Sequence, residues 1–538
     1  MYNFRINKVF WGAAILLLIL HGCAAKKDQP NILFIMSDDH TCQGIGAYSD
    51  PRFRDLDITP TIDRLAEEGM LFYNVFCTNS ICTPSRATIL TGQYNHTNGV
   101  RDLYDPLPPE KQYLPIEMKK AGYQTAVVGK WHLRASPESF DYYNVFPGQG
   151  KYHDPHLYSR DSGELKEIRF DSRLTRQVNI REYKGHSSDV VTGITLDWLK
   201  NKRNKNKPFF LMHHFKAPHD LFENAERYDT YLENVDFPLP ATGYEPQWGS
   251  VATRGHHDSL VHYIGASLGK RNHIRNMGTD LHISQDLPDD AYTMQAYNLY
   301  LKRYLRCVKG VDDNLQRILD YLETSGLMDN TIIIYTGDQG FFLGEHDFID
   351  KRWMYEESLR MPLLIRYPKM IQPGSKNNWI INNTDFAPTI LALAGVKKPS
   401  YMQGNSFVGA LRGEEKPGDW RKVHYYRYWM HMAHKMNNPA HFGIRTERYK
   451  LILFYGTDFI KTGEESNDGN RFGPDTPVAW ELYDLENDPH ETDNIYEKMK
   501  DSKELQELKS QLMQVRNEIG DTDDDFPHIK KIVEAHWN

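Results

Sequence analysis

Four apolar runs of the sequence each end in residues that can bind a metal ion, carry charge or transfer a proton. Residues 31–36 precede Ser-Asp-Asp-His, and residues 125–128 precede Gly-Lys-Trp-His. Residues 209–212 lead to Lys-Ala-Pro-His, and residues 331–335 lead to Thr-Gly-Asp-Gln-Gly. Runs this apolar predict strands buried on both faces of a sheet. If these strands are parallel, their carboxyl ends share one edge, and the four clusters form one site.

The acidic residues of these clusters offer only oxygen ligands. Asp38 and Asp39 follow the first run, and Asp338 and Gln339 follow the last. Hard cations such as calcium or magnesium prefer such ligands, and a divalent ion would relieve the repulsion among three carboxylates. Either pair alone is equally consistent with solvated acids or with a helix cap.

The basic residues of the clusters would form an electropositive pocket beside the metal. The set comprises Lys130, His132, His219 and Lys351, with Arg86 and Arg360 as further candidates. Such a pocket suits a sulfate or phosphate group. Each residue alone is also consistent with a structural histidine or a solvated lysine.

Three motifs together resemble the signatures of the formylglycine-dependent sulfatases, which belong to the alkaline-phosphatase-like superfamily. Residues 80–92 read SICTPSRATILTG, and Cys-x-Pro-Ser-Arg within them is similar to the sequence at which a maturating enzyme oxidises cysteine to formylglycine. Residues 122–132 resemble the second signature, and residues 336–340, followed by Leu-Gly-Glu-His and Lys351, resemble a third. The order and spacing agree over about residues 30–413, and residues 443–494 resemble the C-terminal subdomain of that family.

The resemblance implies a role for each matching residue. Calcium would be bound by Asp38, Asp39, Asp338 and Gln339, with modified Cys82 completing the site; Gln339 stands where relatives commonly carry Asn or His. Arg86 would hold the formylglycine hydrate, which His132 would orient. Lys130 and Lys351 would bind sulfate oxygens, and His219 would protonate the leaving alcohol.

A hydrated aldehyde at position 82 suits sulfate-ester hydrolysis chemically. One hydroxyl, its pKa lowered by the metal, attacks sulfur, and the second then expels sulfate and restores the aldehyde. A serine or an intact thiol lacks that second hydroxyl, so Cys82→Ser or Cys82→Ala should be inactive. The alternatives are a phosphate or phosphonate ester hydrolase of the same superfamily, and a non-catalytic lipoprotein that binds sulfated glycans.

The expected substrate is a sulfated carbohydrate, such as a glycosaminoglycan fragment. His346, Arg352, Trp353 and Arg360 are the candidate sugar contacts, together with the segment at residues 254–257. For each of them, structural packing or an exposed loop is an equally good explanation. Aryl sulfates and choline sulfate are the alternative substrates that the sequence does not exclude.

Composition limits the possible partners and the number of domains. The chain has 538 residues, of which 40% are hydrophobic and 25% charged, and its net charge is −8. This length predicts one large domain and a smaller one. The acidic balance argues against a general nucleic-acid binder.

The N-terminus resembles that of an exported lipoprotein. Arg5 and Lys8 precede an apolar run at residues 11–20, and Leu-His-Gly-Cys at 20–23 resembles a bacterial lipobox. The resemblance implies a signal peptide at 1–22, a lipid anchor on Cys23 and a tether through residue 29. We therefore expect an exported, periplasmic or outer-membrane-anchored protein that touches the membrane only through this anchor; a soluble secreted form stays open.

Four further cysteines lie in the mature chain, at positions 42, 77, 82 and 307. In an oxidising compartment they predict two disulfides or buried thiols, and Cys77 and Cys82 are close enough in sequence to pair.

The remaining patterns predict an α/β fold in two parts. Helical patterns at residues 59–69, 115–121, 189–200 and 295–324 alternate with the strands. They predict a catalytic domain over 30–412, with a large, mixed, mostly parallel sheet between helices. Residues 413–538 are predicted to form a small antiparallel sheet, with strands at 442–445, 449–455 and 480–484, packed against a helix at 504–519. Residues 135–185 and 221–290 show little regular pattern and are expected to be loops.

Overall fold

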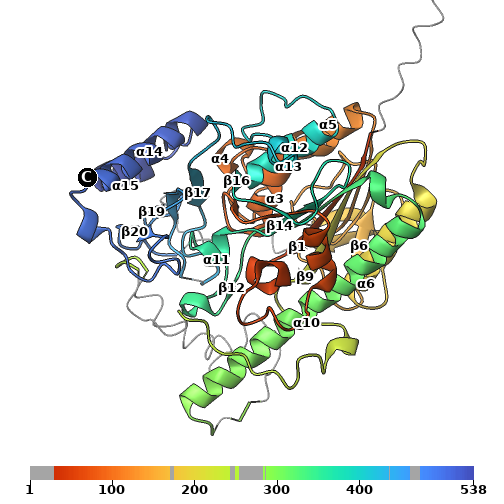
Figure 1. Ribbon diagram of the computed structural model, residues 1–538, viewed down its shortest axis with the longest axis horizontal. Helices are drawn as coiled ribbons and strands as arrows, with labels where there is room; N and C mark the ends of the chain where they lie inside the picture. Colours follow the sequence, from red (N-terminus) through yellow and green to blue (C-terminus); the bar gives the residue numbers. More distant parts are fainter. Residues whose placement is uncertain are drawn as a thin grey trace, which may run out of the picture.

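The centre of the fold is five parallel strands within one eleven-stranded sheet (Figure 1). In spatial order they are β11 (Thr331–Gly337), β1 (Asn31–Asp38), β9 (Phe209–Pro218), β4 (Gln124–Gly129) and β5 (Tyr142–Val145). The four strands expected from the apolar runs are neighbours here, which confirms the predicted parallel arrangement. Their carboxyl ends therefore lie at one edge of the sheet.

The structure is a computed structural model that describes residues 29–169, 175–242, 249–253, 283–284, 286–435, 437–460 and 473–537. The predicted signal peptide, Cys23 and the segment at 254–257 lie outside these residues. Over the described ranges, no helix combines the length and the hydropathy that crossing a bilayer requires.

The central strands are apolar throughout because both faces of the sheet are covered. On β1, Ile32, Phe34 and Met36 pack into one hydrophobic core, whereas Leu33 and Ile35 pack into the other. Successive side chains of a strand point to opposite faces, so a strand between two cores needs apolar residues at every position.

Each core is closed by helices, as Figure 1 shows. One face carries α2 (Pro60–Glu67), α6 (Ser187–Asp197) and the long α10 (Asp289–Thr324). The other carries α3 (Cys82–Thr91), α5 (Tyr113–Lys120) and α12 (Phe386–Leu393). The expected layering of helix, sheet and helix is therefore confirmed.

Both flanks of the sheet contain antiparallel strands. One flank consists of β14 (Leu363–Arg366), β2 (Met70–Phe72) and β15 (Ser375–Asn377), and the other of β6 (His156–Ser159), β8 (Thr175–Glu182) and β7 (Glu164–Arg169). The prediction that residues 135–185 form loops is therefore wrong, because they contain β5 to β8. β7 is exposed along most of its length, and β8 buries only Val178 and Ile180, so the apolar alternation that marks a strand is short or absent in them.

Short elements complete the catalytic part. They are the strand pairs β3 (Val75–Phe76) with β16 (Ile381–Asn382) and β12 (Phe342–Leu343) with β13 (Ile349–Asp350), and the helices α4 (Asn95–Asn98), α11 (Glu356–Leu359) and α13 (Val408–Leu411).

A four-stranded antiparallel sheet follows in the C-terminal part. Its strands are β17 (His424–Tyr428), β18 (His441–Arg445), β19 (Tyr449–Phe454) and β20 (Ala479–Asp484), followed by α14 (Lys503–Ile519) and α15 (Pro527–Ala535). Leu505, Leu508 and Leu512 of α14 pack into a core with the sheet. This confirms the predicted small sheet and its helix.

No described cysteine forms a disulfide. Cys42, Cys77, Cys82 and Cys307 are all free and buried. Of the two predicted alternatives, buried thiols are therefore confirmed and disulfides are wrong; the Sγ of Cys77 lies 3.4 Å from the carbonyl oxygen of Leu359. Cys82 is therefore a thiol whose position needs another explanation.

A buried ionic network joins the small sheet to the catalytic part. The ammonium of Lys450 on β19 lies 2.6 Å from Glu491 and 3.0 Å from Glu356 of α11. Arg445 lies 3.3 Å from the same Glu356. Burial raises the pKa of Glu491 to about 7, although Lys450 opposes this shift.

The substitution Glu491→Gln should flatten the dependence of stability on pH. From about pH 4.5 to about pH 7, native Glu491 keeps a proton that the unfolded chain releases, so raising the pH favours unfolding. Across this window, the free energy of unfolding of the wild-type protein should fall by up to about 3 kcal/mol more than that of the Glu491→Gln variant. Urea unfolding at both ends of the window measures the difference, and equal slopes would contradict the prediction.

Candidate active site

Three carboxylates meet where β1 and β11 end. The two strands pair in parallel with Ser37 opposite Gly337, so Asp38 and Asp338 follow the same point on adjacent strands. Oxygen atoms of Asp38, Asp39 and Asp338 lie within 4.8 Å of one another, and all three residues are buried. The backbone N–H of Asp39 donates to Asp338 across 3.1 Å.

Each of these carboxylates has a cationic partner. Lys130, directly after β4, contacts Asp38, and Lys351, directly after β13, lies 2.6 Å from Asp39. Arg86 of α3 donates to Asp338 across 2.9 Å and to the backbone carbonyl of Lys130 across 2.9 Å. Burial alone would lower the pKa of Lys351, but Asp39, Cys82, Asp350 and Asp338 together raise it, so this lysine stays charged.

The oxygen cluster fits the predicted cation. Among the described residues, one oxygen of Asp38 and the amide oxygen of Gln339 are buried without any hydrogen-bond partner. Burial raises the pKa of Asp39 to about 7; Lys351 lowers it and Asp338 raises it further. Buried oxygens without donors and a destabilised carboxylate are what a hard divalent cation would satisfy.

Cys82 lies beside this cluster at the first position of α3. Its sulfur, an oxygen of Asp38 and a nitrogen of His219 lie within 4.8 Å of one another. The extended backbone of Ile81 turns the chain into the helix, and Arg86 follows Cys82 by one helical turn. Burial raises the pKa of the Cys82 thiol to about 11, so the unmodified thiol would be a weak nucleophile at neutral pH.

The other two predicted catalytic residues also reach this site. The Nε2 atom of His219, directly after β9, lies 3.7 Å from Asp39. His132 lies near Lys130, Arg86 and His219, and its carbonyl accepts a hydrogen bond of 2.8 Å from Thr83 of α3. The structure thus brings together all six residues predicted to be catalytic.

A tyrosine of the small sheet braces the start of α3. The hydroxyl of Tyr426 on β17 accepts a hydrogen bond of 3.2 Å from the backbone N–H of Ser80. The same hydroxyl donates to the carbonyl of Arg352 across 2.8 Å. Tyr426 therefore ties the segment before Cys82 to the segment after Lys351.

A cavity of about 360 Å³ opens over these groups. It is lined by Ile81, Cys82, Leu103, Gln149, Gly150, Lys216, His219, Asp220, Leu221, Asp350, Lys351, Arg352 and His434. His434 belongs to the C-terminal part, so both parts of the chain form the cavity wall.

Of the four residues predicted to contact the sugar, Arg352 alone lines this cavity. Trp353 is buried and stacks on Phe348, with ring centroids 4.8 Å apart. His346 is buried and stacks on Tyr355, and Arg360 pairs with Glu356. Trp353 and His346 are buried, Arg360 is part-exposed, and none of the three is among the residues that line the cavity, so the structure gives no support to their predicted role.

Sequence reasoning missed several residues of the cavity wall. Gln149 lies 2.5 Å from the ammonium of Lys130, and it comes from a region without a recognisable pattern. Asp350 and His434 both contact Arg352, each across 3.2 Å. Lys216 could have been found, because it belongs to the same polar cluster as His219.

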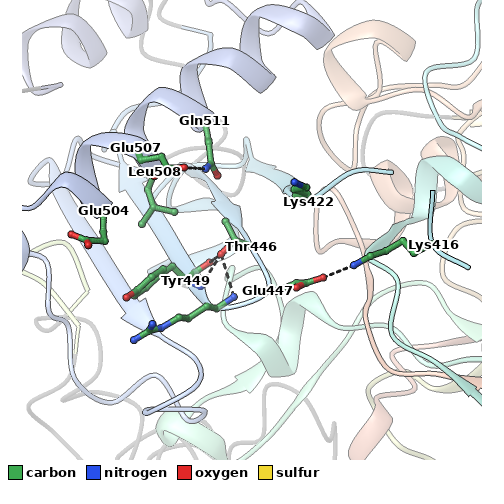
Figure 2. A pocket seen from close by; sticks show the side chains of 10 residues that line it. Lys416, Lys422, Thr446, Glu447, Tyr449, Glu504, Glu507, Leu508 and Gln511 are labelled. Carbon is green, nitrogen blue, oxygen red and sulfur yellow. Dashed lines mark hydrogen bonds and ion pairs between the residues drawn. The ribbon is translucent and has the colours of Figure 1, made fainter. Parts of the chain in front are cut away.

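A larger hollow, about 470 Å³ in volume, lies between α14 and the small sheet (Figure 2). It carries no thiol and no histidine, and Lys416 is paired with Glu447 across 2.7 Å. Its other two basic residues, Lys422 and Arg448, are matched in number by Glu504 and Glu507. Cys82, His219 and Lys351 of the candidate active site line the smaller cavity and not this one.

Comparison with known families agrees with this geometry. The sulfatase family model matches residues 30–396, and the model of the N-sulphoglucosamine sulphohydrolase C-terminal region matches residues 344–468.

Similar proteins extend the comparison to almost the whole chain. An N-acetylglucosamine-6-O-sulfatase of Bacteroides thetaiotaomicron is 38% identical, with 94% of this chain and 90% of the relative covered. The human N-acetylglucosamine-6-sulfatase is 27% identical, with 74% and 68% covered. A solved structure described as a complex with its substrate D-glucosamine-2-N,6-O-disulfate is 36% identical, with a TM-score of 0.76 and coverage of 92% of this chain and 99% of that one.

A phosphonate monoester hydrolase of Agrobacterium radiobacter, 20% identical with a TM-score of 0.65 and coverage of 91% and 96%, shares the fold alone. The length of the family match and the identity to the Bacteroides relative decide the family: this chain belongs to the sulfatases and is a sulfuric ester hydrolase.

Proposed function

We propose that the protein removes the 6-O-sulfate group from an N-acetylglucosamine or glucosamine residue of a sulfated carbohydrate. The observation that carries the substrate assignment is the 38% identity, over nearly the whole chain, to an N-acetylglucosamine-6-O-sulfatase. A cavity of about 360 Å³ is at the small end of ligand sites, which favours a single sugar residue at a chain end.

The proposed chemistry depends on two groups that the residues present would hold. Calcium bound by Asp38, Asp39, Asp338 and Gln339 would supply positive charge, and formylglycine made from Cys82 would supply the nucleophilic oxygen. Lys130 and Lys351 would then be free to bind sulfate oxygens and stabilise the charge that develops on them.

The remaining residues would orient the nucleophile and protonate the leaving sugar oxygen. Arg86 is fixed by Asp338 and by the carbonyl of Lys130, and it would hold the modified residue one helical turn away. His132 orients the hydrate, and His219 gives a proton to the leaving sugar oxygen. Arg352, Asp350 and His434 offer hydrogen bonds to sugar hydroxyls on the outer wall.

A screen of defined sugars tests the substrate. Maturated protein should release sulfate from N-acetylglucosamine-6-sulfate and glucosamine-6-sulfate at least about 100-fold faster than from the 3-sulfate or from galactose-6-sulfate. Release from another position or sugar would replace the proposed substrate. Faster turnover of phosphate or phosphonate esters would favour that class of hydrolase instead, and binding without release would favour a glycan-binding protein.

The substitution Lys351→Ala should lower kcat/KM by about 10²- to 10³-fold, because it removes one cation that stabilises the transition state. Steady-state kinetics on the preferred sugar sulfate measure the loss. Lys376 provides the matched control, because it lies on the edge strand β15. Lys376→Ala should keep kcat/KM within about twofold, and an equal loss in both variants would contradict the assignment.

Export and lipidation are part of the proposal, and they rest on the sequence of residues 1–23. In a bacterial host, the full chain should fractionate with membranes, and Cys23→Ala should release it. Recovery of both forms from the soluble fraction would contradict the anchor.

A further inference from the structure

The carboxylate of Asp220 lies against the ring of His219, on the side away from Asp39. The Nδ1 atom of His219 contacts the Asp220 carboxylate and lies 2.6 Å from the Asp220 backbone carbonyl. Both partners are acceptors, so Nδ1 carries a hydrogen whichever of them it faces. The other ring nitrogen, Nε2, is the one directed towards Asp39, 3.7 Å away.

The surrounding residues hold this pair in place. The hydroxyl of Tyr152 donates to the backbone carbonyl of His219. Lys216 points its ammonium at the Asp220 carbonyl, 3.5 Å away, and at the Tyr152 ring, 4.7 Å from its centroid. The side chains of His219 and Lys216 are buried, whereas the Asp220 side chain is part-exposed and lines the cavity.

Asp220 favours the protonated form of His219, and His219 favours the ionised form of Asp220. Burial lowers the pKa of His219, and the Asp220 carboxylate is the main group that opposes this shift. Burial alone would raise the pKa of Asp220, but His219, Lys351 and Lys216 together lower it, so Asp220 stays ionised.

We infer that Asp220 is a positioning residue for His219: by accepting the Nδ1 hydrogen it fixes the ring and leaves Nε2 as the nitrogen that faces the leaving oxygen. This role rests on the proposed function, because it concerns the proton that the leaving sugar oxygen needs. It also explains why an acidic residue directly follows His219 in this sequence.

The step balances as follows. If the deprotonated hydroxyl of a formylglycine hydrate at position 82 is the nucleophile, sulfur would gain a bond to that oxygen while the bond between sulfur and the sugar oxygen breaks, and the electron pair of the broken bond would stay on the sugar oxygen. His219 would enter the step as the imidazolium, with a hydrogen on each ring nitrogen, and its Nε2 proton would move to that oxygen. His219 ends neutral, with its Nδ1 hydrogen still donated to Asp220.

The test compares leaving groups that need a proton with those that do not. In Asp220→Asn, kcat/KM for the preferred sugar sulfate should fall about 10- to 100-fold, whereas kcat/KM for 4-nitrophenyl sulfate should fall less than about threefold, because nitrophenolate leaves unprotonated. Glu223→Gln removes a nearby charge of the same loop without touching His219, and it should alter neither value by more than about twofold.

A double-mutant cycle on the sugar sulfate gives a second, independent readout. Adding Asp220→Asn to His219→Ala should cause no further loss, because the residue that Asp220 positions is already gone. Equal losses for both leaving groups, an unchanged rate on the sugar sulfate, or losses that multiply in the double variant would each overturn the positioning role. If the maturated wild-type protein releases no sulfate from any ester, the proposed function fails and this role fails with it.

Discussion

Cys82→Ala and Cys82→Ser are expected to lower kcat/KM for the sugar sulfate by about 10⁴-fold or more. Cys82 is the only thiol within reach of both Asp38 and His219 among the described residues. Alanine supplies no nucleophile, and serine supplies a single hydroxyl that cannot expel sulfate by returning to an aldehyde. The measurement is sulfate release under single-turnover conditions by variants co-expressed with the maturating enzyme.

Cys77 offers the matched control, since it is a second buried thiol five positions earlier. Cys77→Ala should keep turnover within about threefold and lose only stability, by about 1 kcal/mol. Peptide mass spectrometry should find an aldehyde at position 82 and an intact thiol at position 77 in the active protein. Full turnover by either Cys82 variant would exclude the proposed nucleophile.

Removal of divalent cations should abolish turnover and lower the Tm. Three buried carboxylates within 4.8 Å of one another repel, and burial already raises the pKa of Asp39 to about 7. A cation that binds only the folded state, at about 1,000 times its Kd, would add about 4 kcal/mol to the free energy of unfolding. Dialysis against a chelator, followed by calcium or magnesium, measures both effects.

Calcium should restore activity and Tm more fully than magnesium, because magnesium requires a stricter octahedral site. Asp338→Asn keeps the size of the side chain but removes a charge, and it should abolish the calcium-dependent rise in Tm. Full turnover by protein shown to be free of metal would refute a catalytic cation.

The residues at strand ends could be found from the sequence because their positions follow from the sheet itself. Once residues 31–36 and 331–335 are read as parallel neighbours, Asp38 and Asp338 must lie close together. Cys82 and Arg86 could be found for another reason, since one helical turn separates them within a long recognisable motif.

The outer wall of the cavity could not be found in this way. Trp353 lies next to Arg352 in sequence, yet it packs in the core. The sequence could not show this, because the irregular segment between β13 and α11 has no periodicity that indicates which side chains face inward. Gln149 and His434 come from irregular segments far apart in sequence, and only the folded chain shows that both line the same cavity. The spacing of the cysteines left disulfides and buried thiols both open for a similar reason, since it does not show that Cys77 packs against Leu359.

The brace formed by Tyr426 has a consequence for how such enzymes can diversify. One hydroxyl from β17 supports both the approach to Cys82 and the strand-end segment that holds Lys351 and Arg352. Exchanging the last quarter of the chain for that of a relative would therefore replace the cavity-lining His434 and, at the same time, alter the hydrogen bonds that support the segment before Cys82. We therefore expect such an exchange to change substrate selectivity and turnover together.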